Sequence, residues 1–158
     1  MLVRCGSAYP EAACPQKKLY RLLETTVIAV DNNIIVYFYL STEHGPNADR
    51  LLQQDREWIA PPIWKSEFRN SLVLYLRQQL LTIDEALSIQ ARAELMMSSG
   101  ERAVDSSEVL RLAHASRCSA YDCEYVALAE EQGVRLVTED KLILREFPNI
   151  AVSLANAL

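Results

Sequence analysis

The sequence predicts an α/β protein in which a parallel β-sheet of about four to five strands is sandwiched by helices. Short apolar runs of strand length alternate along the chain with longer segments of helical periodicity, which is typical of such a sheet. The 158 residues are half hydrophobic, enough for one domain with a sizeable core. No internal repeat or low-complexity tract interrupts the alternation.

The first residues differ from the rest of the chain. Residues 1–25 contain two cysteines, two prolines and the pair Lys17-Lys18, without a sustained hydrophobic period. At most a short helix over Leu19–Glu24 fits the pattern. We therefore expect a loosely attached, disordered N-terminal extension over residues 1–25, followed by one folded domain over residues 26–158.

The first elements of that domain form a strand–helix–helix–strand series. Val27–Val30 is a buried-strand run, and the apolar and aromatic residues Ile34–Leu40 suit a buried helix. Gly45-Pro46 breaks the chain. A short amphipathic helix is expected over Asn47–Asp55, and a second strand over Trp58–Ala60.

Two helices and a weak strand follow. Pro61-Pro62 marks the start of a helix whose apolar residues recur every three or four positions, at Trp64, Phe68, Leu72, Tyr75 and Leu76. Thr82 and Glu85 form a capping box for the next helix, which we expect to run to about Ser98 and to stop before Gly100. Ala103–Val104 is a weak candidate for a third strand.

The last third of the chain repeats the alternation. Asp105 with Glu108, and Ser119 with Asp122, are capping boxes for helices expected to end near Cys118 and at Gly133. The run Val134–Val137 predicts the fourth strand. Thr138-Glu139-Asp140 opens a short helix to Phe147, and the apolar residues 150–152 form a candidate fifth strand.

Composition excludes several kinds of site. The four glycines, at positions 6, 45, 100 and 133, are too far apart for a Gly-rich nucleotide-binding loop. The four cysteines include no C-x-x-C pair and there are two histidines, which argues against a zinc or thiolate site. No apolar run reaches the roughly 18 residues of a membrane span, and no signal-peptide core is present. A cytoplasmic protein without a membrane association is expected.

Four acids are candidate site residues: Asp31, Glu67, Asp122 and Asp140. Three of them come just after a strand or at a helix start, and Glu67 lies in the second turn of its expected helix, near an aromatic flank. Each also has a local explanation. Asp31 suits an N-cap, Glu67 a solvated helix edge, Asp122 the acid of a capping box, and Asp140 a first-turn acid favoured by the helix dipole.

Together the four acids predict a metal site. Ligands bind in the crevice at the carboxyl ends of parallel strands, and several carboxylates in one crevice are stable only with cations or protons. Oxygen ligands alone favour Mg²⁺ or Mn²⁺, which typically serve phosphoryl chemistry. We expect Asn33, Thr138 and Ser66 to orient the acids as hydrogen-bond partners.

Four segments resemble, in order and spacing, the PIN-domain ribonucleases, with the closest similarity to VapC-type toxins of toxin–antitoxin pairs. They are VIAVDNN (27–33), APPIWKSEFRN (60–70), SAYDCEYVALA (119–129) and LVTEDK (136–141), and the resemblance extends from about Val27 to Leu154. It implies a PIN-like fold and a metal-dependent endoribonuclease. Asp31, Glu67, Asp122 and Asp140 then correspond to the family's acids, which hold Mg²⁺ or Mn²⁺ and hydrolyse RNA.

The resemblance also implies a homodimer and an antitoxin that inhibits the enzyme by covering the crevice. One departure stands out, because the family usually has Thr or Ser directly after the first aspartate and this chain has Asn32. Asparagine keeps a hydrogen-bonding side chain but changes its length, which bears on fine metal placement.

RNA contact is the weaker part of the sequence argument, because the formal net charge is −5 and nucleic-acid binders are usually basic. Bound cations would offset the acids of a metal site. Basic residues near the expected crevice are candidates for phosphate contacts, and solvated helix-face charge explains each equally well. They are Lys65, Arg69, Arg77, Lys141 and Arg145.

Two other functions are compatible with parts of the pattern. A non-catalytic PIN-like module that binds RNA or protein is favoured by Asn32 alone. A phospho-acceptor signalling domain would need a pair of acids after the first strand, where this chain has Asp31-Asn32-Asn33.

Overall fold

The computed structural model describes residues 27–40 and 42–158. The predicted extension over residues 1–25, with its short helix at Leu19–Glu24, lies outside the described residues. No helix in the described ranges combines the length and apolarity that crossing a membrane requires.

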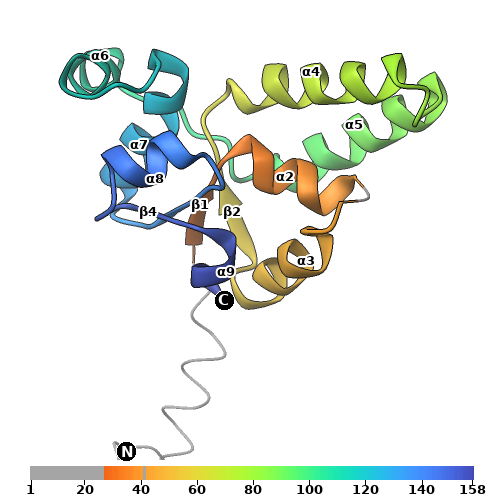
Figure 1. Ribbon diagram of the computed structural model, residues 1–158, viewed down its shortest axis with the longest axis horizontal. Coiled ribbons are helices and arrows are strands. Elements are labelled where there is room, and N and C mark those ends of the chain that lie inside the picture. The colour runs from red at the N-terminus through yellow and green to blue at the C-terminus, as the bar shows by residue number, and fades with distance from the viewer. Residues whose placement is uncertain (1–26, 41) are drawn as a thin grey trace, which may run out of the picture.

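A parallel sheet with helices around it is the centre of the fold (Figure 1). Its strands are β1 (Val27–Val30), β2 (Glu57–Ile59), β3 (Leu136–Val137) and β4 (Ala151–Val152), in the spatial order β2-β1-β3-β4. Every pairing is parallel, with Val30 opposite Val137 between β1 and β3. The predicted α/β class is therefore confirmed, and β1 is an inner strand flanked by β2 and β3.

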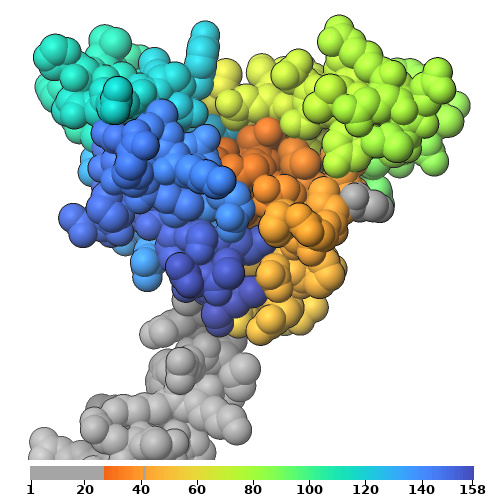
Figure 2. All heavy atoms as spheres, viewed as in Figure 1, coloured from red at the N-terminus to blue at the C-terminus, as the bar shows by residue number. Residues whose placement is uncertain are grey.

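Helices make all the connections between these strands. They are α2 (Asn32–Tyr39), α3 (Gly45–Gln54), α4 (Trp64–Arg77), α5 (Ile83–Met97), α6 (Ser106–Ala115), α7 (Ala120–Gln132), α8 (Lys141–Glu146) and α9 (Leu154–Ala157). The α4–α5 hairpin and α6 project on opposite sides of the body (Figure 2). The C-terminal helix α9, which packs against α3, was not predicted from the sequence.

The helix α7 is the most deeply buried helix of the described chain. Six residues of its thirteen are buried, and they include the continuous run Tyr125–Ala129. A helix that is apolar on more than one face belongs inside a core. It packs against β1, β3 and α6, so its N-terminus is fixed beside the carboxyl ends of the central strands.

The local capping predictions hold for two helices. Thr82 with Glu85 and Ser119 with Asp122 both form complete capping boxes. Gly133 ends α7 in the left-handed conformation at φ 64°. At α6 the predicted cap is right but the capping box is not complete. Asp105 accepts a hydrogen bond from the amide of Ser107, whereas Glu108 forms an ion pair with Arg111. The helix ends at Ala115, before the expected end near Cys118.

The predicted third strand at Ala103–Val104 is wrong, because these residues lie in an irregular segment. A single parallel bridge forms slightly earlier, between Ala60 and Glu101. The amide of Ala60 donates to the carbonyl oxygen of Gly100, and the amide of Arg102 donates back to Ala60. This close approach of two backbones is possible because Gly100 has no Cβ.

We predict that Gly100→Ala is more destabilising than Gly133→Ala. A Cβ on Gly100 would lie 1.9 Å from the carbonyl oxygen of Trp58, so backbone must move, at a cost of roughly 3 kcal/mol. A Cβ on Gly133 meets no atom within 4 Å, which leaves only the strain of positive φ, about 1 kcal/mol. Urea denaturation measures both values. An equal or smaller loss at Gly100 would contradict the described packing.

Candidate active site

The pairing of β1 with β3 brings Asp31 and Thr138 together. Val30 and Val137 are register partners at the ends of their strands. Asp31 directly follows β1, and Thr138 directly follows β3. The hydroxyl of Thr138 donates to Oδ2 of Asp31 at 2.5 Å, and both residues are buried. A contact across 107 residues of sequence thus follows directly from the sheet register.

Asn33 fixes this pair to the loop after β3. Its amide nitrogen donates to Oδ2 of Asp31 at 2.6 Å and to the hydroxyl of Thr138 at 3.3 Å. Its amide oxygen accepts from the backbone amide of Glu139, and the amide of Asp140 donates to Thr138 at 2.9 Å. The predicted orienting roles of Asn33 and Thr138 are therefore consistent with the observed hydrogen bonds.

Asp31 is held in a site that disfavours its charge. Burial raises the pKa of its carboxyl from 3.8 to about 6, and repulsion from Asp140 adds to the rise. The Thr138 hydroxyl and the backbone amides of Asn32 and Asn33 offset part of the effect on the pKa. Asp31 occupies the N-cap position of α2 but makes no side-chain capping bond, so the N-cap interpretation does not explain its burial.

Glu67 lies at the end of the first turn of α4 and faces the same region. The buried phenol of Tyr125 on α7 donates a short hydrogen bond to its Oε2. Burial raises the pKa of Glu67, the Tyr125 hydrogen bond opposes the rise, and the carboxylates of Asp31, Asp122 and Glu124 add to it. Glu67 is partly buried and is not the solvated helix-edge residue of the local interpretation.

Asp122 and Asp140 both serve helix N-termini. Asp122 is the acid of the Ser119 capping box, as its local interpretation requires, whereas Asp140 is the N-cap residue of α8 and not the expected first-turn acid. Oδ2 of Asp122 accepts from the amide and hydroxyl of Ser119 at 2.9 and 2.8 Å. Oδ1 of Asp140 accepts from the amides of Leu142 and Ile143 at 2.7 and 3.0 Å. Capping uses one oxygen of each carboxylate, and in the described part of the chain the second oxygen accepts no hydrogen bond. A capping role therefore leaves a ligand atom available.

The four acids are close enough to affect one another electrostatically. Repulsion links Asp31 to Asp140, and Glu67 to both Asp31 and Asp122. Among residues 27–40 and 42–158, however, no three Asp, Glu, His or Cys side chains lie close enough together to hold one metal ion as they stand. The donor chemistry fits Mg²⁺ or Mn²⁺, since all four ligands are carboxylates with an oxygen to spare. Joint coordination would require side-chain rotation.

The remaining predicted residues are placed differently. Ser66 accepts a hydrogen bond from Arg69, and within the described chain it bonds to none of the four acids. Arg69 also donates to the carbonyl of Lys65 on its own helix. Lys65 forms an ion pair with Glu101 at 2.7 Å, whereas exposed Lys141 forms none with a described residue.

Sequence reasoning missed two residues that contact Glu67. Tyr125 suits the apolar face of its helix by sequence alone, but a buried tyrosine hydroxyl needs a hydrogen-bond acceptor, and that requirement is the signal that could have pointed to Glu67. Ser71 donates to the backbone carbonyl of Glu67 at 3.1 Å and lies 3.5 Å from the amide nitrogen of Asn32. Asn32, the departure from the family pattern, therefore connects α2 to α4, and its buried Oδ1 has no partner among the described residues.

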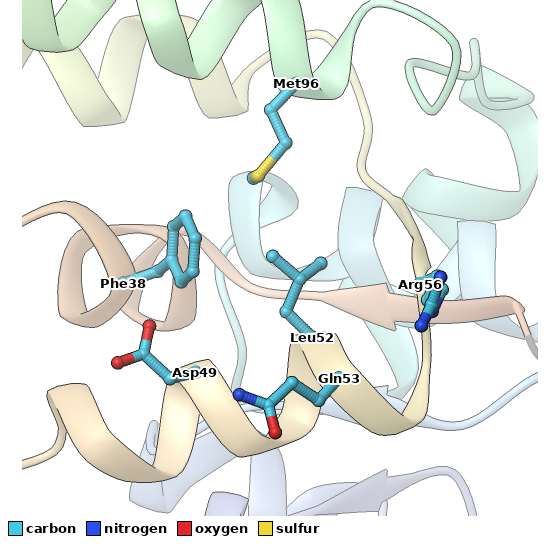
Figure 3. Close-up of a pocket in the computed structure, with 6 residues that line it drawn as sticks. All are labelled: Phe38, Asp49, Leu52, Gln53, Arg56 and Met96. Carbon is cyan, nitrogen blue, oxygen red and sulfur yellow. The ribbon is translucent and has the colours of Figure 1, made fainter.

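Two hollows elsewhere on the molecule contain none of these acids. One lies between α2, α3 and α5 (Figure 3), lined by Phe38, Asp49, Leu52, Gln53, Arg56 and Met96. The other lies at the amino ends of β1 and β3 and includes Val27, Asp55 and Arg135. Neither gathers like charges or paired acids, so they offer no competing catalytic site.

Comparison with known proteins agrees with this assignment of the fold. The family model of the PIN domain matches residues 28–148. The chain is 29% identical over 126 residues to "Ribonuclease VapC3" of Pyrobaculum aerophilum. The aligned region covers 77% of this chain and 95% of that protein. The crystal structure of PAE2754 from Pyrobaculum aerophilum superposes with a TM-score of 0.61 at 21% identity, covering 82% of this chain and 93% of that one.

We predict that Asp31 makes the metal-free protein less stable as pH rises. With a pKa near 6 in the folded chain against 3.8 ordinarily, the folded state binds this proton more tightly, so protonation between about pH 6 and 4 favours folding. From about pH 7 to 4.5 the wild type should gain about 2 kcal/mol relative to Asp31→Asn.

Urea denaturation with a chelator present, at both pH values, measures this difference. The same substitution at exposed Asp49 on α3 is the control. Parallel pH profiles for the wild type and Asp31→Asn would contradict the described burial of Asp31.

Proposed function

Because this chain belongs to the PIN-domain family, we propose that it is a Mg²⁺- or Mn²⁺-dependent endoribonuclease, the toxin of a VapBC-type toxin–antitoxin pair. The observation that supports the proposal is the pairwise electrostatic repulsion of Asp31 with Asp140, and of Glu67 with Asp31 and Asp122, inside the matched region. The similarity to Ribonuclease VapC3 supports RNA as the substrate.

The four carboxylates would hold the metal through the oxygens that the fold leaves free. When bound, Mg²⁺ or Mn²⁺ supplies positive charge that stabilises the negative charge developing on phosphate oxygens and favours ionisation of an attacking water. Thr138 and Asn33 keep Asp31 oriented by fixing its Oδ2. Without a cation, the four acids would repel the phosphates of RNA.

Basic side chains near the acids would contact the RNA backbone. Lys141, directly after Asp140, is exposed and makes no ion pair with a described residue, so it is the strongest candidate. Lys65 would have to leave Glu101, and Arg69 would have to give up hydrogen bonds within α4. Phosphate contacts of this kind position RNA without reading its sequence.

The proposed partners are an antitoxin and a second copy of the chain. Exposed apolar side chains around the tip of the α4–α5 hairpin would suit a protein interface: Leu74, Leu80, Ile83 and Leu87 are 52–62% exposed. The proposed antitoxin would inhibit by covering the acids. A cytoplasmic location, together with the RNA substrate, is part of this proposal.

We expect Asp122→Asn to abolish cleavage of structured RNA in Mn²⁺, with a loss of roughly a hundredfold or more. Asparagine keeps an oxygen that can cap α7, so the fold should survive, while a charged metal ligand is lost. The assay follows RNA fragments on a denaturing gel, together with Mn²⁺ binding by calorimetry.

Asp105→Asn is the matched control, since the Asp105 carboxylate also accepts hydrogen bonds from the amide and hydroxyl of a serine, Ser107, at a helix N-terminus. It should cleave RNA like the wild type. Equal cleavage by Asp122→Asn and wild type would end the nuclease assignment. A wild type that binds RNA, but does not bind Mn²⁺ and does not cleave RNA, would favour the non-catalytic module.

A further inference from the structure

Tyr125 links the deeply buried helix α7 to Glu67. Its side chain is 1% exposed, and its hydroxyl donates to Oε2 of Glu67 on α4. Tyr125 comes three residues after Asp122, so the two side chains share one face of α7. One helix therefore presents a candidate ligand and, one turn further, a hydrogen-bond donor to a second candidate ligand.

The hydroxyl is a permanent donor. A tyrosine hydroxyl carries a proton and an ionised carboxylate oxygen can only accept one, so Tyr125 is the donor in its hydrogen bond to Glu67. The donor cannot move far, because the ring is enclosed in the core and a buried aromatic side chain is held by close packing. Glu67, by contrast, is partly buried and has three flexible side-chain bonds.

Only one oxygen of Glu67 is used by this contact. Oε2 accepts from Tyr125, and Oε1 has no hydrogen-bond partner among residues 27–40 and 42–158. Ser71 holds the backbone of Glu67 in place from the next turn of α4. Both the main chain and one carboxylate oxygen are therefore fixed, which leaves a single oxygen with a defined orientation.

We propose that Tyr125 is a positioning residue, whose hydroxyl fixes Oε2 of Glu67 and thereby holds Oε1 ready to bind the divalent cation. This rests on the proposed function, in which Glu67 is a metal ligand. Hydrogen-bond partners of metal ligands reduce the reorganisation that binding requires, and their loss typically weakens metal binding 10- to 100-fold.

A double-mutant cycle on Mn²⁺ affinity separates positioning from a merely structural role. Calorimetric titration of the full-length chain with Mn²⁺ is carried out on wild type, Tyr125→Phe, Glu67→Gln and the double variant, with thermal melts by circular dichroism. Phenylalanine keeps the buried ring and removes only the donor. Tyr39→Phe is the matched control, since the Tyr39 hydroxyl donates to the carbonyl of Arg92, between α2 and α5.

We expect Tyr125→Phe to weaken Mn²⁺ binding about tenfold, with a melting temperature within a few degrees of the wild type. Tyr39→Phe should bind Mn²⁺ like the wild type. In the Glu67→Gln background, Tyr125→Phe should change the affinity by less than about twofold, because the group through which it acts is gone.

Wild-type Mn²⁺ affinity in Tyr125→Phe, with RNA cleavage intact, would overturn the positioning role alone. The same tenfold loss in both backgrounds, or a variant that no longer folds, would also overturn it, because the hydroxyl would then serve the structure. Unchanged affinity in Glu67→Gln would overturn it by removing Glu67 as a ligand. A wild type that binds no Mn²⁺ would overturn the metal-dependent function as well.

Discussion

Negative charge concentrated beside the ends of β1 and β3 is the constraint on which the rest of this structure depends. Asp31 is buried there with a raised pKa, and the carboxylates of Glu67, Asp122 and Asp140 add mutual repulsion. Such an arrangement costs stability unless protons or cations are present. The backbone positions of these acids follow from the register of β1 with β3, which places Asp31 beside Thr138, and from the buried helix α7, which carries Asp122.

Hydrogen bonding reduces that cost without removing the chemistry. Thr138 and Asn33 both donate to one oxygen of Asp31, and Tyr125 donates to one oxygen of Glu67. One oxygen of Asp122 accepts from the amide and hydroxyl of Ser119, and one oxygen of Asp140 accepts from amides of α8. Local interpretations as helix caps and the proposed role as metal ligands are therefore compatible. Each carboxylate divides its two oxygens between the fold and the site.

Sequence reasoning succeeded where the cause of a structure is local. The capping boxes at Thr82 and Ser119 depend on residues three positions apart. The left-handed conformation of Gly133 follows from the backbone sterics of glycine. The parallel sheet follows from the alternation of strands and helices, and the position of Asp31 follows from the strand before it. Three of the four acids were chosen for their positions after strands or at helix starts, and Glu67 for its place near an aromatic helix flank and for the family resemblance. Metal binding by these four acids stays a prediction.

It failed where the cause is distant in sequence. The bridge at Glu101 exists because Gly100 lies against Trp58, which the apolar pair Ala103-Val104 does not reveal. Helix α9 begins where Glu139 accepts from the amide of Leu154, fifteen residues away. The acceptor of Tyr125 is 58 residues away on another helix.

The most direct test of joint coordination is a crystal structure of the wild-type chain soaked in Mn²⁺, with anomalous scattering to locate the ion. We expect an anomalous peak within coordination distance of carboxylate oxygens from at least three of the four acids: Asp31, Glu67, Asp122 and Asp140. An ion bound elsewhere, or by one of these acids alone, would contradict it.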